Sequence, residues 1–165
     1  MNKTNDASLD LSYFMHDTTP TEATYPAPKR FVDKNGNRLQ LVFRILPEEE
    51  IREIRKHWHK RTIVKDDKTK RPIILSNGNV AVDETYDGQS AMQEMLVESL
   101  VYPNLKDTAL LNHYNCLNAI EMPLKVFPRP DDLAYVVKAF DILHGYERDG
   151  ENVEETESDL EKAKN

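Results

Sequence analysis

The strongest constraint on the fold is an alternating apolar segment that closely follows an Asn-Gly pair. From residue 38 to residue 46 the large apolar side chains recur at every second position, and this period of two predicts a strand with one buried face. Asn35-Gly36 supplies the positive φ angles of a tight turn, so residues 29–32 are the predicted partner strand. Ordered structure is therefore expected to begin at Lys29 with a β-hairpin. The apolar positions are Leu39, Leu41, Phe43 and Ile45.

Helical patterns dominate the chain after this hairpin. Proline followed by acidic residues predicts one helix start at Pro47 and another at Pro130, and Gly145 is expected to end the helix that begins at Pro130. Ser90 with Gln93 resembles a capping box that opens a helix running to about Val101. Two shorter helices are expected after Asp107 and over residues 118–127. The predicted class is α+β, with one or two N-terminal hairpins followed by a mainly helical domain of about four to five helices.

Residues 62–82 interrupt this order with two short β-branched runs around a charged turn. They predict a second hairpin, which is expected to protrude from the domain as an insertion. Residues 1–28 are rich in Thr and Pro and are predicted to form a flexible arm. The expected organisation is thus this arm, a single domain over 29–146 with the insertion at 62–82, and an acidic tail over 147–165.

The charge distribution argues against a nucleic-acid partner. The net charge is -7, and residues 146–165 contain eight acidic and three basic side chains, which leaves the body near -2. A nearly neutral body with an acidic tail would not release counterions from a duplex. No run of about 18 apolar residues predicts a membrane span, and a single cysteine, Cys116, suits a reducing cytoplasm. We expect an intracellular protein that does not bind membranes.

Catalytic and cofactor motifs are sparse. The five glycines are scattered, so no phosphate-binding loop is predicted. His113 and Cys116 have the residue types of a base and a thiol, but a third orienting residue is not evident. His57 and His59 flank Trp58, a spacing that directs two helical imidazoles to nearly opposite sides, whereas metal-binding helical pairs use three or four. The sequence predicts no enzyme, no cofactor and no metal site, and a metal-dependent enzyme using His57, His59 or His113 is the most distant alternative.

Four sequence segments, in a fixed order along the chain, resemble those of a known family. They are KRFVDKNGNRLQLVFRILPEEE, LVESLVYPNLKDTALLNHYN, DILHGY and EKAKN. Together they resemble the XkdN-like tail assembly chaperones of phages and defective prophages of Gram-positive bacteria, over roughly residues 29–165 apart from 62–82. Two departures are the longer 62–82 segment and Phe127-Pro128-Arg129-Pro130, which stands where relatives tend to have Gly-Glu.

The resemblance implies a partner rather than a substrate. Proteins of this kind bind the long tape measure protein, keep it soluble and deliver it for tail tube assembly. It implies further contacts with the tail tube protein and with a longer form of the same chain, and it leaves self-association open. The expected location is the host bacterial cytoplasm and not the mature virion. The alternative is a structural tail component retained in the virion.

A groove of flexible apolar side chains would suit such a partner. The expected partner-binding set centres on the second helix and the phrase that follows it, and ordinary core packing is the alternative role of its methionines. The set is Met92, Met95, Leu96, Tyr102, Pro103, Leu105, Leu110 and Met122.

The last residues imply a second product. In related phages the chaperone is made in two lengths, the longer by ribosomal frameshifting. Ala163-Lys164-Asn165 can be encoded GCA-AAA-AAC, which contains the slippery run A-AAA-AAC. We expect a programmed frameshift at these codons and an overlapping reading frame beyond them.

Overall fold

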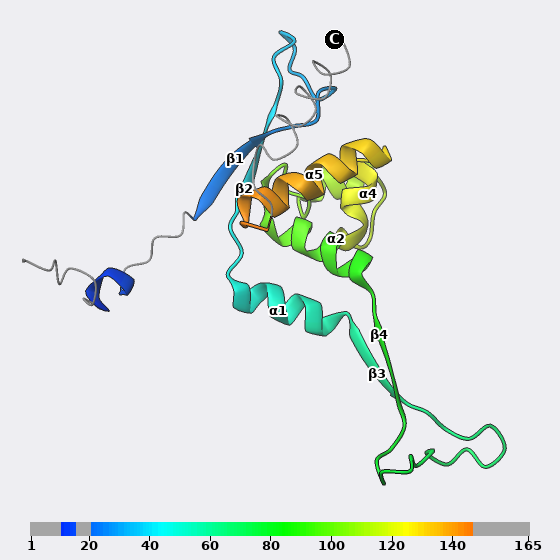
Figure 1. Cartoon of the computed structure of the whole chain (residues 1–165). Helices are drawn as coiled ribbons and strands as arrows, with labels where there is room; N and C mark the ends of the chain where they lie inside the picture. The colour runs from blue at the N-terminus through cyan, green and yellow to red at the C-terminus, as the bar shows by residue number, and fades with distance from the viewer. Residues whose placement is uncertain (1–10, 16–20, 147–165) are drawn as a thin grey trace, which may run out of the picture.

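A computed structural model describes residues 11–15 and 21–146. The main sheet has three antiparallel strands in the order β1-β2-β5: β1 is Glu22–Pro26, β2 is Gln40–Arg44 and β5 is Leu100–Tyr102. Helices cover one side of this sheet, and a separate two-stranded ribbon projects away from it (Figure 1). A short 3-10 helix, η1 at Leu11–Phe14, precedes the sheet.

The central strand β2 matches the alternating pattern of the sequence. Leu41 and Phe43 are buried, while Leu39 and Ile45 are half-buried. The predicted turn also forms, because Gly36 adopts a φ of 82° and the Asp33 carboxylate accepts hydrogen bonds from the backbone of residues 35 and 37. These backbone hydrogen bonds, that from Asn37 above all, lower the pKa of Asp33.

The principal partner of β2 differs from the expected one. Residues 29–32 contribute only an isolated bridge, Val32 to Arg38, and the regular ladder joins β2 to β1. Regular structure therefore begins at Glu22, before the expected boundary at Lys29. Pro26 had argued against a strand here, but β1 lies at the sheet edge, where one side of the backbone needs no ladder partner.

The helix α2, Gly88–Ser99, is the centre of the helical layer. It contacts α1 (Glu48–His57), α4 (Met122–Val126), α5 (Pro130–Leu143) and strands β2 and β5. Buried residues occur around much of its circumference, as expected of a helix surrounded by other elements. They are Ala91, Gln93, Met95, Leu96, Val97 and Ser99.

The helix starts follow the local capping chemistry, with one correction. Asp107 caps α3, Thr108–His113, and Asn118 caps the 3-10 helix η2, Ala119–Glu121. The cap of α2 is Asp87 and not Ser90: the Asp87 carboxylate accepts from the Ser90 backbone N–H at 3.0 Å and from its hydroxyl at 2.7 Å. The predicted capping box is therefore wrong, because the helix begins three residues earlier than its signature implied.

The end of α2 also differs from the expectation. The helix ends at Ser99, and residues 100–102 become the edge strand β5 before the cis peptide bond Tyr102-Pro103. Pairing with β2 at Val42 and Phe43 outweighs the helical pattern in this segment.

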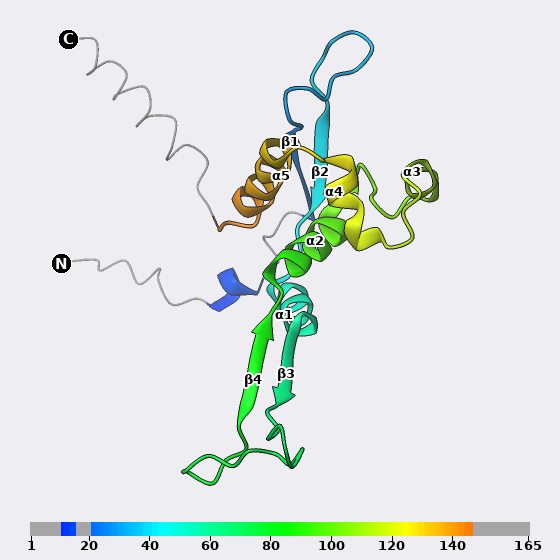
Figure 2. The same cartoon turned by 90° about the vertical axis from the view of Figure 1, so that its right-hand side faces the viewer.

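The ribbon, defined as residues 59–86, joins α1 to α2. Strand β3, His59–Ile63, pairs with β4, Val82–Tyr86, and beyond this ladder two isolated bridges, Lys65 to Pro72 and Ile74 to Val80, each close a separate loop. The expected insertion is thus a hairpin, but its strands start three residues before residue 62 and extend four residues past residue 82. Figure 2 shows it extending from the helices as a narrow arm. All of its residues are exposed except Val64, Ala81 and Val82, which are half-buried.

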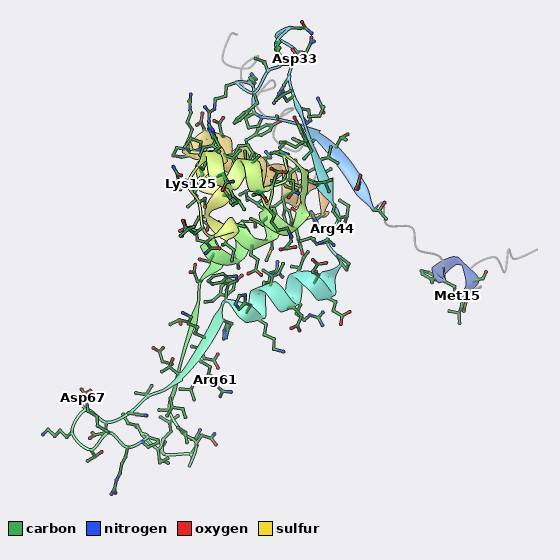
Figure 3. All side chains as sticks on the ribbon, turned by 180° about the vertical axis from the view of Figure 1, so that it is seen from behind. Met15, Asp33, Arg44, Arg61, Asp67 and Lys125 are labelled. Carbon is green, nitrogen blue, oxygen red and sulfur yellow. The ribbon has the colours of Figure 1, made fainter. Side chains whose placement is uncertain are left out.

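We call residues 21–58 and 87–146, the domain without the ribbon, the body. Two polar contacts join separate elements of the body. Arg44 donates to both carboxylate oxygens of Glu50, at 2.9 and 2.7 Å, and to the Glu98 carbonyl at 3.3 Å; it lies where β2 approaches α1 (Figure 3). The hydrogen bonds from Arg44 lower the pKa of Glu50. The Leu46 backbone N–H donates to His144 Nε2 at 2.9 Å. Among the described residues, no helix is long and apolar enough to cross a membrane.

Candidate partner-binding surface

An apolar groove lies where the sheet meets α3 and α4. Its volume is about 220 Å³, and no charged side chain lines it. Gln40 is the one side-chain amide in a lining that is otherwise apolar or aromatic. The lining residues are Ala27, Phe31, Leu39, Gln40, Leu41, Tyr102, Pro103, Leu110, Tyr114, Val126 and Phe127. We call this site the apolar groove.

Five separate segments of the chain bring these side chains together. The irregular stretch after β1 supplies Phe31, whose ring packs edge-on against Phe127 with 5.4 Å between the centroids. The end of β5 supplies Tyr102, and α3 supplies Leu110 on its half-buried face. The groove therefore exists only when the sheet and the helices are folded together.

The size and lining of the groove indicate what it can accept. Sites for small molecules and cofactors usually measure about 300–1,000 Å³ and contain several convergent polar groups. This groove is smaller and presents almost no polar group, so it suits one or two apolar side chains of another protein. Such anchoring is how amphipathic helices and extended peptides bind.

An ion pair between an exposed guanidinium and a buried carboxylate ties down the segment that forms one wall. The Arg30 guanidinium contacts the carboxylate of Asp132, which is 7% exposed near the start of α5. Arg38 donates to the Ala27 carbonyl at 2.5 Å and to the Tyr135 hydroxyl at 2.9 Å. A buried carboxylate without an ionic partner costs free energy. The ion pair therefore holds the segment that carries Arg30 in one position against the start of α5.

The structure divides the expected partner-binding residues into three groups. Tyr102, Pro103 and Leu110 line the apolar groove. Met92 is half-buried against the core. The remaining four pack inside the body with at most 2% exposure, so their side chains support the surface rather than form it: Met95, Leu96, Leu105 and Met122.

Sequence reasoning did not select several residues of this groove. Leu39 and Leu41 were predicted only to lie on the buried face of a strand, and Tyr114 was not singled out. Phe127 was noted only as part of the segment Phe127-Pro128-Arg129-Pro130. Aromatic residues beside prolines were the available signal, but they do not reveal which segments meet in space.

The histidines and the cysteine make contacts of an ordinary structural kind. His57 Nδ1 lies 3.2 Å from the Glu94 carboxylate, which also accepts from the Trp58 indole. The buried Cys116 thiol donates to the Asn118 carbonyl at 3.1 Å. Over residues 11–15 and 21–146, no three His, Cys, Asp or Glu side chains are grouped so that they could hold a metal ion.

Comparison with known proteins agrees with this architecture. The phage XkdN-like tail assembly chaperone family matches residues 11–157. The chain is 33% identical to the uncharacterized protein YqbN of Bacillus subtilis over 156 residues, covering 93% of this chain and 95% of YqbN. It is 30% identical to the phage-like element PBSX protein XkdN of Bacillus subtilis over 158 residues, covering 94% and 97%. A crystal structure of YqbN superposes with a TM-score of 0.59 at 24% identity, covering 84% of this chain and 98% of that one, and this likeness concerns the fold.

Proposed function

The chain belongs to the phage XkdN-like tail assembly chaperone family, which is non-enzymatic, and we propose that it binds the tape measure protein, keeps it soluble and delivers it for tail tube assembly. The observation that carries this proposal is the apolar groove, a small uncharged site beside a sheet edge. A long protein with exposed apolar segments aggregates before assembly, and a chaperone must cover those segments reversibly.

The groove offers two modes of contact for such a segment. Its apolar lining accommodates a large side chain. The outer edge of β5 is also close by, because β5 ends at Tyr102, which lines the groove with Pro103. In the described part of the chain, no strand pairs with that edge. A partner can therefore add backbone hydrogen bonds at the edge to the apolar contact in the groove.

A matched pair of substitutions tests the groove. Leu110→Gln places an amide in the lining, whereas Leu117→Gln changes a fully exposed leucine outside it. Burying one leucine is worth about 1.5–3 kcal/mol, so we expect Leu110→Gln to weaken binding about 10- to 100-fold and Leu117→Gln to leave it unchanged. Binding is measured by calorimetry on the complex obtained by co-expression with the tape measure protein.

Two results would contradict the proposal. One is the absence of a soluble complex under every expression condition. The other is mass spectrometry of purified virions that finds this chain in stoichiometric amounts, because a chaperone that acts in the host cytoplasm leaves before the tail is complete. The second result would favour a structural tail component.

The frameshift is a separate part of the proposal. The chain is the shorter of two products, the longer one departs from it at the codons of Ala163-Lys164-Asn165, and the chain contacts this longer form and the tail tube protein. The nucleotide sequence tests this directly: an A-AAA-AAC run followed by an overlapping frame supports it, whereas a run broken by AAG or the absence of an overlapping frame refutes it.

A further inference from the structure

A second, basic groove lies between α1 and the base of the ribbon. Its volume is about 770 Å³, and its lining contains four cationic side chains, one histidine, one tyrosine and no acidic residue. Figure 3 labels Arg61 on the ribbon strand that leaves α1. The lining residues are Arg52, Arg55, Lys56, His59, Arg61 and Tyr86. We call this site the α1 groove.

Helical spacing explains why these charges gather. Ile51 and Ile54 turn into the core, and the residues at positions 52, 55 and 56 share the neighbouring exposed face. Arg52 has no ion-pair partner within the described residues, Lys56 meets the exposed Glu53 at 3.8 Å, and Arg61 meets the exposed Glu84 at 3.3 Å. Exposed pairs of this kind contribute little, so the basic surface is available to a stronger anionic ligand.

The chain passes beside this groove at the end of its described part. The Tyr146 hydroxyl donates to the Glu48 carboxylate at 3.3 Å, and the Arg55 guanidinium lies 5.8 Å from the centre of the Tyr146 ring. Arg55 also lines the α1 groove. The residues that follow Tyr146 are therefore attached next to the groove.

Those residues have the complementary charge. Between residues 149 and 161 the chain contains seven acidic side chains and no basic one, namely Asp149, Glu151, Glu154, Glu155, Glu157, Asp159 and Glu161. We propose that the acidic segment 147–165 docks in the α1 groove of the same molecule. Attachment through Tyr146 gives the segment an effective concentration of about millimolar, an advantage that a separate acidic partner lacks.

Length and screening are consistent with this placement. The nineteen residues 147–165 extend by up to about 65 Å, and the ten residues of α1 span about 15 Å, so the segment reaches the whole groove. At about 0.15 M salt, charges separated by more than about 8 Å are largely screened, so the attraction requires contact in the groove. An acidic partner would have to displace the segment. This inference does not depend on the proposed function, because it concerns a different groove.

Paramagnetic broadening in the full-length protein tests the proposal. Cys116→Ser removes the single native thiol, and Glu155→Cys accepts a nitroxide in the acidic segment. In ¹⁵N-labelled protein at low salt, we expect amides over residues 52–61 to lose at least half of their intensity. The intensity should return in 0.5 M NaCl, where the ion pairs are screened.

A charge-reversal pair supplies the control. Arg52→Glu with Lys56→Glu should abolish the broadening, whereas Lys34→Glu with Lys138→Glu, at exposed positions away from the groove, should preserve it. A dispersed amide spectrum shows that each variant is folded. The proposal is overturned if α1 shows no broadening, or if Arg52→Glu/Lys56→Glu broadens as before. It is equally overturned if broadening occurs only between a spin-labelled copy and a separate ¹⁵N-labelled copy.

Discussion

The body and the ribbon follow different rules of stability, although the ribbon leaves the body and returns to it within one chain. The body buries aromatic and aliphatic side chains from strands and helices around Phe43 and Phe140. The ribbon contains no fully buried residue, and several of its large apolar side chains are at least 39% exposed. Its two strands depend on their ladder and turns, and an isolated two-stranded hairpin is marginally stable in water. The free energy of unfolding therefore comes mainly from the body, and the exposed ribbon is available for intermolecular contacts.

The largest expected effect comes from the centre of the body. Phe43→Ala removes a fully buried ring from the middle strand and should lower the free energy of unfolding by about 3–5 kcal/mol. The matched ribbon variant Ile74→Ala, at a side chain that is 59% exposed, should change it by less than about 0.5 kcal/mol. Urea denaturation followed by circular dichroism measures both. Equal losses of unfolding free energy in the two variants would contradict the conclusion that the body, and not the ribbon, stabilises the fold.

An intermediate effect is expected where the ribbon joins the body. Asp87 directly follows the ribbon and caps α2, and backbone and side-chain hydrogen bonds from Ser90 lower the pKa of its carboxyl group. Asp87→Ala should lower the free energy of unfolding by less than Phe43→Ala does, because the carboxylate that accepts two hydrogen bonds from Ser90 at the helix start is lost. Asp67→Ala, near the far end of the ribbon in Figure 3, is the control and should be neutral. A neutral Asp87→Ala would show that the cap is not needed.

Acid should affect the body through His144. Its Nε2 accepts from the Leu46 N–H and its Nδ1 lies 2.8 Å from the Phe140 carbonyl, so the folded state requires the neutral ring, and burial lowers the pKa of His144 below 6.5. Since the unfolded chain binds the proton more readily, this contribution to stability is complete above about pH 6.5 and is lost as the pH falls through the lower folded pKa. Unfolding free energies measured between pH 7 and pH 5 should show this decline. His144→Gln should flatten it, and an unchanged slope in that variant would assign the decline to another group.

The smallest effect is expected from shortening the ribbon. The Val64 N–H donates to the Ala81 carbonyl at 2.9 Å, so these residues are placed to be joined by a two-residue turn. Replacing residues 65–80 with Asn-Gly, a favoured hairpin turn, should change the unfolding free energy of the body by less than about 0.5 kcal/mol. Denaturation measures it, and a loss above about 2 kcal/mol would make the ribbon part of the folding unit.

Much of the fold follows from local chemistry in the sequence. The strand around Phe43, the turn at Gly36, the cap at Asp107 and the helix from Pro130 to Gly145 were predicted from periodicity and end signals, and the structure confirms them. The edge strand β5 was missed because its stability depends on pairing with β2, which is distant in the sequence. The strand β1 was missed because its prolines suggested an irregular arm.

The candidate surface was less predictable for the same reason. Tyr102, Pro103 and Leu110 lie in one phrase of the sequence and do meet at the apolar groove. Met95 and Met122 have the same residue type as a flexible binding surface, yet both are buried. Residue type does not decide whether a side chain faces a partner or the core; the packing of α2 among its neighbours does.

The hydrogen bond between Leu46 and His144 has a consequence for biosynthesis. Its donor and acceptor are 98 residues apart in the chain. At a translation rate of about 5–20 residues per second, the acceptor is made about 5–20 s after the donor. Throughout that interval the nascent chain contains β2 and α1 but lacks the complete α5, which His144 follows. The body therefore completes its fold only after residue 144 has been synthesised.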